Sequence, residues 1–571
     1  MDLLTSCTLT ALILLIFTSC GAFYRHFVKA DESTFLTAAT FVLSLSTSFI
    51  LVLFIPVDIY LVSNGDIEIS NLEITQRLVS KFYHSIFWVL IFEAYILVPF
   101  SYFYVKNKRY YRNEFDDYIV PCENVIESFK KTIYFICLIV ALSIIGLVYR
   151  PGHKLAMEKG KELEYISDLL DMKHTGESAI LFLMGCVVLI GVSFWVTYTS
   201  YGIACLPLSF LQQKNIEYDK KEIETRFANL KEKEMVIKVG STGRKTIITL
   251  GISLKGYRRV SFGMMTLIQI FNTPLSISQH KYRESSEIRG SDKYEILRIE
   301  KMQRALSRYN YKLQEIEKTS ESWLSYVIGI VLTCRVITGL VFLTFSFSVY
   351  ISLLASITDK YLNSVCAYKC GFVLEKINTI FNLLDSSLIL FSRFFPLDIF
   401  IIASLAIYIF CCSLYGIVNV GIRVCFIPLY KLKARRSSPE TMLVLCFVII
   451  HIILVLIMTL LTIAPNYITY GIQRIRINDT PAFIKCSLKT DKNVCKMSVL
   501  SVFFNKIFFG IPYFANSYFF SNWMFILMYS FSFIYRIFFK RISYLDNLDE
   551  LNLSKENMDE HMNLLPLEKL T

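Results

Sequence analysis

The sequence predicts an all-α, polytopic integral membrane protein with about nine transmembrane helices. Of its 571 residues, 54% are hydrophobic and only 19% are charged, whereas about a quarter of the residues are charged in a typical soluble domain. The mean hydropathy is +0.49. The apolar residues form runs of about 20 residues, the length that crosses a hydrocarbon core about 30 Å thick. This composition excludes a disordered chain and a single soluble enzyme domain.

Nine such runs occur along the chain, with ends defined to within several residues. The first run has no basic residues before it, and Arg25 and Lys29 follow it. This arrangement favours an uncleaved span over a signal peptide. The predicted spans cover residues 3–24, 34–55, 82–104, 132–149, 179–205, 326–355, 399–424, 442–463 and 513–537.

The basic residues near the span ends predict the orientation in the membrane. Lys and Arg gather in the short loops 106–131 and 425–441, whereas loop 56–81 is acidic. We therefore expect the N-terminus in the lumen or outside the cell, and the C-terminus in the cytosol. The basic loop 464–512 indicates the opposite orientation, but it is longer, and the other short loops outnumber it.

These spans divide the chain into two membrane bundles, a large cytosolic loop between them and a cytosolic tail. Apolar stripes at helical spacing near both ends of the loop predict a helical hairpin, which is either a solvated spacer or a docking surface for a partner. Its middle, residues 236–290, is rich in Gly, Ser and Thr and is expected to pack poorly. The parts are 1–205 with five spans, the loop 206–325, 326–538 with four spans and the lumenal loops 356–398 and 464–512, and the tail 539–571.

The charge distribution indicates a lipid bilayer as the partner, and no nucleic acid. The net charge of +12 lies mostly in the predicted cytosolic segments, beside anionic headgroups, and no basic soluble module is present. The seven histidines lack metal-ligand spacing, and HExxH, CxxC, GxSxG and GxGxxG motifs are absent. The sequence therefore predicts no enzyme, no bound metal and no tightly bound cofactor.

The loop 464–512 carries two features that depend on a lumenal position. Cys486 and Cys495 are close enough in sequence to form a disulfide in an oxidising compartment, which would contribute about 2–3 kcal/mol. Asn478 begins an N-glycosylation sequon. Each feature therefore tests the predicted orientation.

Several polar residues lie inside predicted spans, where a charge costs about 2.5–3.5 kcal/mol and usually faces the bundle or a cavity. Glu93 in the third span is expected either to be hydrogen-bonded or ion-paired, or to line a solute path. Asn419 and Arg423 belong to the seventh span, and Arg423 is near enough to its cytosolic end to reach the interface. His451 in the eighth span is interpreted as a core histidine rather than a proton carrier.

Prolines lie at several predicted span ends, where Pro breaks or starts a helix and Asp can cap one. Helix punctuation is the simplest interpretation of these residues. Before the seventh span, the interrupted apolar segment 372–395 predicts an interfacial or re-entrant helix. The boundary residues are Pro56 with Asp58, Pro207, Pro396 with Asp398, and Pro465.

The segments around these prolines are long, and they occur in a fixed order. Together they resemble the LMBR family, also called lipocalin-interacting membrane receptors, over nearly the whole chain. The segments are FIPVDIYLVS (54–63), VPFSYFY (98–104), TYTSYGIACLPLSFL (197–211), FPLDIF (395–400), YGIVNVGI (415–422), IPLYKLKARRSSPETMLVLC (427–446) and APNYITYGIQ (464–473).

The resemblance implies nine spans with a lumenal N-terminus. It is strongest to the branch that lies in the lysosomal membrane, partners an ABC-type transporter and is needed for cobalamin (vitamin B12) to leave the lysosome. Cobalamin is then the expected transported or escorted ligand, and a lysosomal or vacuolar membrane the expected location. The Cys486–Cys495 pair also matches this branch. The loop middle 236–290 and the tail 539–571 differ from the family, and the resemblance assigns no cobalamin-binding residue.

Two classes of function remain open. One is a carrier or escort for cobalamin export. The other is a receptor or trafficking adaptor at the plasma membrane or another endomembrane, which moves no solute. A third class, an ion channel or lipid-moving protein, has less support. A carrier is expected to place Glu93 and Asn419 around a polar cavity near the midplane, whereas a bundle packed by Leu and Phe favours an escort or receptor.

Overall fold

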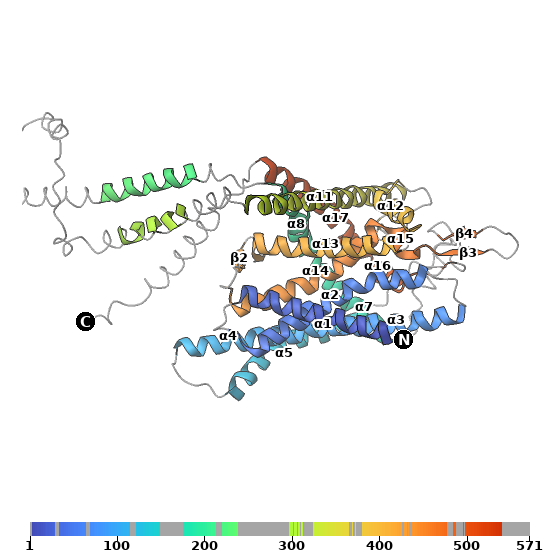
Figure 1. The fold of residues 1–571 in the computed structure, drawn as a ribbon. Coiled ribbons are helices and arrows are strands. Elements are labelled where there is room, and N and C mark those ends of the chain that lie inside the picture. The colour runs from blue at the N-terminus through green and yellow to red at the C-terminus, as the bar shows by residue number, and fades with distance from the viewer. Residues whose placement is uncertain are drawn as a thin grey trace, which may run out of the picture. The chain divides into compact units, whose positions relative to one another are not determined.

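The structure is a computed structural model of the chain, drawn in Figure 1. The chain forms two compact units, Met1–Leu211 with Ile337–Lys540, and Gln212–Val336 with Arg541–Thr571, and each is described by itself. The described residues are 3–28, 33–63, 69–114, 121–148, 175–212, 220–237, 296–300, 302–304, 306–308, 310–311, 324–364, 368, 372, 380–394, 396–424, 427–430, 432, 437–476, 483–486, 495 and 497–538.

Helices dominate both units, and two short antiparallel hairpins, β1–β2 and β3–β4, complete the described structure. The elements are α1 (Leu3–Phe27), α2 (Phe35–Ser63), α3 (Ile69–Phe92), η2 (Glu93–Leu97), α4 (Val98–Glu114), α5 (Pro121–Val148), α7 (Thr175–Phe194), η3 (Trp195–Thr199), α8 (Ser200–Leu211), α11 (Leu324–Asn363), α12 (Leu383–Phe391), α13 (Leu397–Val420), β1 (Ile422–Val424), β2 (Ile427–Tyr430), α14 (Pro439–Ile463), α15 (Pro465–Tyr470), β3 (Arg474–Arg476), β4 (Phe483–Lys485), α16 (Val499–Gly510) and α17 (Pro512–Phe538).

The predicted membrane architecture is confirmed. Within the described residues, eight helical stretches are long and apolar enough to cross a membrane. A ninth candidate, Val499–Phe508 with Pro512–Phe538, is bent by 103°, so the last predicted span is one arm of a bent pair. In Figure 1, α1 begins at the end of the bundle where β3 and β4 lie. This arrangement agrees with the expectation that the N-terminus and the loop 464–512 share one side.

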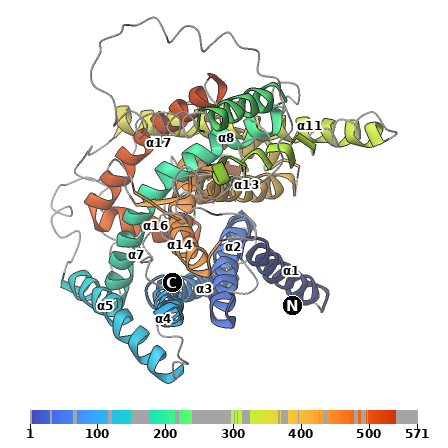
Figure 2. The same cartoon turned by 90° about the vertical axis from the view of Figure 1, so that its left-hand side faces the viewer.

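Helix α14 forms the centre of the membrane bundle. It begins with the Ser438 side chain accepting from Thr441 N and with Pro439 in the first turn, two features that favour a helix start. Helices α2, α4, α7 and α13 pack around it, as Figure 2 shows when the bundle is viewed from one end. Burial reaches 89% of the apolar stretch in α14 but only 11% in Glu123–Gly146 of α5. Helix α5 is therefore peripheral.

Two of the prolines predicted at span ends lie inside helices instead. Pro56 is within α2 and Pro207 within α8, so the second span extends to Ser63 and the fifth to Leu211. Both prolines are buried, and neighbouring helices can support a membrane helix where Pro removes a backbone hydrogen bond.

The other two prolines do lie at helix starts. Pro396 is the N-cap of α13, and Pro465 is in the first turn of α15. Between the sixth and seventh spans, α12 lies within the segment 372–395 for which an interfacial or re-entrant helix was predicted. The exposed side chains of Leu390, Phe391 and Phe394 at the end of α12 give this region an apolar surface.

In the second unit, residues 220–237 and the described residues within 296–311 are helical. Ile223, Ile299 and Leu306 are buried, and Gln303 Nε2 donates to Glu234 Oε2 at 2.9 Å across the two helices. These contacts agree with the predicted hairpin. Nearly all of its expected irregular middle, the tail and Asn478 lie outside the described residues.

Candidate functional site

Each of two membrane spans is interrupted by a π-helical turn. Neither turn was predicted from the sequence. Turn η2 separates α3 from α4, and turn η3 separates α7 from α8. Both turns contact α14. A π-turn inserts an extra residue into a helix and occurs frequently at functional sites. The buried polar groups beside these two turns are therefore the first candidates for a site.

Glu93 opens η2 and is fully buried. Its Oε2 accepts a hydrogen bond from Thr47 Oγ1 of α2 at 2.8 Å, whereas its Oε1 has no hydrogen-bond partner among the residues that the structure describes. The Cys446 thiol of α14 lies nearby. The expectation of a hydrogen-bonded role is therefore met by one oxygen only.

His451 lies on the buried side of α14, next to η2. Its Nδ1 is 2.7 Å from the carbonyl oxygen of Phe447, and its Nε2 is 3.4 Å from the hydroxyl of Tyr95. The rings of Tyr95, Phe194 and Phe447 surround the imidazole. This environment is that of a core histidine. Among the described residues, no group of three or more His, Cys, Asp or Glu side chains is suited to hold a metal ion.

Turn η3 is tied to the neighbouring helix and to β1 by hydroxyl groups. Thr199 Oγ1 lies 2.8 Å from Ser413 Oγ of α13. The hydroxyl of Tyr198 accepts a hydrogen bond from the backbone N–H of Arg423 at 2.9 Å.

Asn419 and Arg423 do not join Glu93 in a central site. The predicted seventh span is too long at its end, because Gly421 with φ 76 ends α13 and Arg423 lies in β1. Positive φ favours glycine, which lacks a Cβ. The Asn419 side chain is exposed and donates to the carbonyl oxygen of Tyr415 in its own helix.

The helices around α14 approach closely at glycines. A methyl group at Gly191 would overlap the carbonyl oxygen of His451, and one at Gly416 would overlap that of Tyr198. Small residues allow such backbone contact between membrane helices. Backbones of neighbouring helices are therefore in direct contact at these two positions.

At the end of the bundle predicted to be lumenal, Asp58 holds another helix in place. It is buried, and its Oδ2 accepts from Leu500 N at 3.1 Å and from the Tyr83 hydroxyl at 3.4 Å. Leu500 lies in the first turn of α16, where backbone N–H groups lack helical partners. Asp58 thus caps α16, which is more than 440 residues away along the chain.

Two further aspartates fix α15 at the same end. Asp385 of α12 accepts from Tyr467 N at 2.9 Å and from Asn466 Nδ2 at 2.7 Å. Asp398 of α13 accepts from the Tyr467 hydroxyl at 2.8 Å. Burial, followed by the bond to Asp398, raises the pKa of Tyr467, so this hydroxyl remains a donor. The role of Asp385 was missed, although its place three residues after the N-cap Asn382 is a local capping signal.

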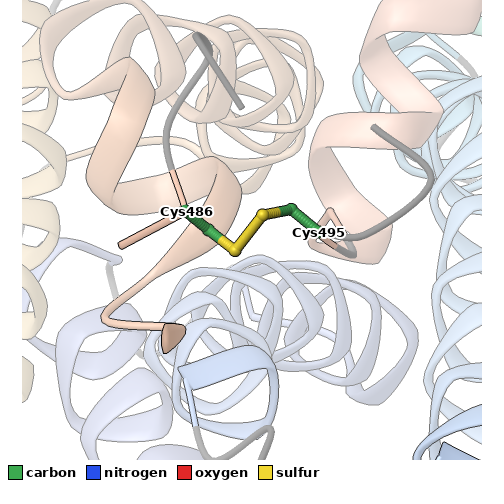
Figure 3. The surroundings of a disulfide bond; sticks show 2 residues. All are labelled: Cys486 and Cys495. Carbon is green, nitrogen blue, oxygen red and sulfur yellow. A yellow bond between two sulfur atoms is a disulfide. The ribbon is translucent and has the colours of Figure 1, made fainter. Parts of the chain in front are cut away.

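A disulfide joins Cys486 and Cys495, with their Cα atoms 5.9 Å apart, as Figure 3 shows. Both residues are buried with Tyr470, and Met497 packs against them. Two backbone hydrogen bonds lie beside the disulfide, from Cys486 N to Gln473 O and from Ser498 N to Thr469 O. The second joins the start of α16 to α15. We use "lumenal cap", after the predicted orientation, for α15, the β3–β4 hairpin, the disulfide and the start of α16, together with the three aspartates.

The comparisons with known proteins agree with this architecture. The LMBR1-like membrane protein family matches residues 5–470. The chain belongs to this family. It is 26% identical to the lysosomal cobalamin transport escort protein LMBD1 of Mus musculus over 95% of both chains. It is 25% identical to a "Probable lysosomal cobalamin transporter" of Nematostella vectensis, over 95% of this chain and 94% of the relative. No solved structure matches the chain.

The segments that resemble the LMBR family contact one another in the structure. At the lumenal cap, FIPVDIYLVS (54–63) contacts APNYITYGIQ (464–473), because Ser63 Oγ accepts a hydrogen bond from Ile472 N. The segment 464–473 also contacts FPLDIF (395–400), because the Tyr467 hydroxyl donates to Asp398. At the other end, Tyr102 of VPFSYFY lies 3.1 Å from the Tyr430 hydroxyl. The family segments therefore hold together both ends of the bundle.

Proposed function

We propose that this protein is a lysosomal membrane protein required for the export of cobalamin from the lysosome to the cytosol. The observation that carries the proposal is the similarity over nearly the full length of both chains to proteins named for lysosomal cobalamin transport. These names support a role in lysosomal cobalamin handling. The direction of transport and the mechanism are part of the proposal.

Within this function we propose an escort rather than a carrier. Asn419 is exposed near the end of α13 whereas Glu93 is buried, most buried side chains of α14 are aliphatic, and glycines bring neighbouring backbones into contact. A carrier needs a binding site near the bilayer midplane between its repeats or bundles. The packing around α14 supports an escort, which needs only to assemble with the protein that moves the solute.

The partner is proposed to be an ABC-type lysosomal transporter, bound within the lipid bilayer. The peripheral helices α1 and α5 have apolar stretches that are only 17% and 11% buried inside this chain. Exposed side chains on them, such as Leu14, Leu15 and Tyr134, are suited to acyl chains and to membrane helices of a partner. Cobalamin then contacts the partner, and the escort needs no cobalamin site of its own.

The test is the distribution of labelled cobalamin in cells depleted of this protein. We expect cobalamin to accumulate in the lysosomal fraction and to return to the cytosol when the wild-type protein is re-expressed. Glu300→Ala, which removes an exposed ion pair with Arg304 outside α1 and α5, is a control that should restore export as the wild type does. Normal cytosolic delivery after depletion would refute the proposal and leave a receptor or trafficking adaptor as the function.

A second measurement separates escort from carrier. Purified protein in liposomes should take up no labelled cobalamin, while depletion in cells should lower the amount of the ABC-type partner in the lysosomal fraction. Uptake by the purified protein alone would contradict the escort mechanism and retain the export function.

A further inference from the structure

The Glu93 carboxyl is poorly matched to a permanent negative charge. It is fully buried, one oxygen accepts a single hydrogen bond from Thr47, and the other oxygen has no partner. A buried ionised carboxylate requires several hydrogen bonds or a paired cation, because its desolvation is costly. The neutral acid requires neither. The arrangement therefore suits a carboxyl group that carries a proton for at least part of the time.

A row of hydroxyl groups on α2 leads to this carboxyl. Thr37, Thr40, Ser44 and Thr47 are spaced by three, four and three residues, so they lie on one face of the helix. The row extends about 15 Å at 1.5 Å per residue. It begins near the start of α2, the end of the bundle opposite to the lumenal cap, and it ends at Glu93.

The hydroxyl groups along this row are linked to neighbouring helices. The Tyr24 hydroxyl of α1 lies 2.9 Å from Thr37 Oγ1, and Ser101 Oγ of α4 lies 2.8 Å from Thr40 Oγ1. Thr47 Oγ1 donates to Glu93 at 2.8 Å. Each of these hydroxyls can accept one proton while it donates another.

Ser44 distinguishes this row from ordinary helix hydroxyls. Ser and Thr in membrane helices usually donate to a carbonyl one turn earlier, as Ser48 donates to the carbonyl oxygen of Ser44. Ser44 Oγ itself is buried and has no hydrogen-bond partner. Its hydroxyl lies along the row between the Thr40–Ser101 pair and the Thr47–Glu93 pair but is hydrogen-bonded to neither, so transfer past it requires rotation of the Ser44 side chain.

We propose that Glu93 is a reversible proton-binding site, loaded and unloaded through the hydroxyl row of α2. In loading, a hydronium ion gives its proton to the row and becomes water. As the Ser44 hydroxyl rotates to hydrogen-bond first one neighbour and then the next, each hydroxyl accepts one proton and releases another, and the last proton joins a carboxylate oxygen of Glu93. Unloading reverses the same steps, so no oxidant or reductant is needed. This inference does not depend on cobalamin.

Few other ionisable groups face this carboxyl. From α14, the groups nearby are the Cys446 thiol and, one turn further on, the His451 imidazole. Helix α7 places the Cys186 thiol near Tyr95. The half of α5 after Phe135 contains one ionisable side chain, Cys137, which is exposed. Helix α2 presents hydroxyls along this row, and among the described residues no cationic side chain is paired with Glu93.

Infrared difference spectroscopy of the purified protein in lipid nanodiscs tests the proposal. The carbonyl stretch of a protonated carboxyl in a dry site is distinct from that of a carboxylate, and Glu93→Gln removes it. We expect a band that is absent in this variant and that loses intensity reversibly as the pH is raised. A band that depends on Glu93 but stays constant over the whole accessible pH range would overturn the proposal, because the acid would then be purely structural.

Ser44→Ala tests the route. We expect it to slow hydrogen–deuterium exchange of the Glu93 band at least tenfold, while the pH midpoint of that band stays the same. Ser143→Ala, which removes a hydroxyl that donates to the carbonyl oxygen of Ile139 within α5, is the matched control and should leave both quantities unchanged. Exchange at the wild-type rate in Ser44→Ala would refute the hydroxyl row.

A second readout keeps the proposal testable if Glu93→Gln does not fold. The apolar reagent dicyclohexylcarbodiimide modifies protonated carboxyls within membranes, and mass spectrometry locates the adduct. We expect labelling of Glu93 in the wild-type protein that decreases as the pH rises. Labelling of Glu93 that is absent or independent of pH would contradict reversible proton binding.

Discussion

Removing the Asp385 carboxyl should destabilise the lumenal cap. Asp385→Ala leaves the buried backbone N–H of Tyr467 without its acceptor, and it also removes the acceptor for the partly buried Asn466 amide. A buried donor without a partner costs about 1–3 kcal/mol. The two losses together should lower the free energy of unfolding by about 2–4 kcal/mol. Asp385→Asn retains one acceptor oxygen and should lose about half as much.

Thermal unfolding in detergent or nanodiscs measures this loss, with a thiol-reactive dye that reports exposure of the buried Cys412 and Cys446. The matched control is Glu127→Ala, which breaks a partly exposed ion pair with Lys131 and should cost at most about 0.5 kcal/mol. We expect the melting temperature to fall most for Asp385→Ala, less for Asp385→Asn and least for the control. If Asp385→Ala and the control unfold together, the carboxylate does not hold α15 and the reasoning is wrong.

Three further predictions concern packing, the disulfide and orientation. Gly416→Ala places a methyl group against the carbonyl oxygen of Tyr198 and should lower the free energy of unfolding by about 1–3 kcal/mol. The control Gly21→Ala meets nothing within 4 Å and should not destabilise the protein. Equal melting temperatures of the two variants would contradict the close helix contact. Cys486→Ser should lower the free energy of unfolding by about 2–3 kcal/mol and reduce delivery to the membrane of residence, whereas a free thiol at this position in the mature protein, detected by mass spectrometry, would disprove the bond. Treatment with an N-glycosidase should increase gel mobility through Asn478, and an unmodified Asn478 would count against a lumenal loop.

The membrane spans could be predicted from the sequence because they depend on composition over a long window. The run at 442–463 is apolar except for His451 and two threonines, and α14 covers it and adds a polar first turn from Pro439. Its place at the centre of the bundle does not follow from hydropathy, since lipid and protein surroundings favour the same apolar residues. Burial on all sides depends on which helices surround it, and that is set by contacts far along the chain.

Predictions of helix ends were wrong where a contact with a distant part of the chain outweighed a local sequence rule. They were also wrong where one residue changed the backbone conformation. Pro56 was expected to end a helix, but α2 continues past it to Ser63, whose hydroxyl accepts from Ile472 N. Gly421 ends α13 early, and Arg423 therefore lies outside the span. The π-turn at Glu93 had no sequence signal, because one extra residue in a helix leaves the apolar pattern almost unchanged.

Asp58 and Asp398 were both predicted to be boundary residues; Asp398 does lie in the first turn of α13, whereas Asp58 lies inside α2, and the partners of neither were predicted. Both were assigned to the ends of their own helices, where Asp is a common cap. In the structure, Asp58 binds the start of α16 and Asp398 binds the Tyr467 hydroxyl of α15. Periodicity along one helix contains no information on contacts between residues 69 and 442 positions apart.

The contacts between the family segments also limit what the resemblance says about function. Tyr467 meets Asp398, Ser63 meets Ile472, and Tyr102 meets Tyr430, and each pair joins two family segments. These segments therefore specify the fold, which escort and receptor members would share. A substitution within them should impair either function through folding alone. Residues that distinguish cobalamin export from lipocalin reception must then lie outside the family segments. An experiment that follows the ligand therefore separates the two functions, whereas substitutions in the shared segments do not.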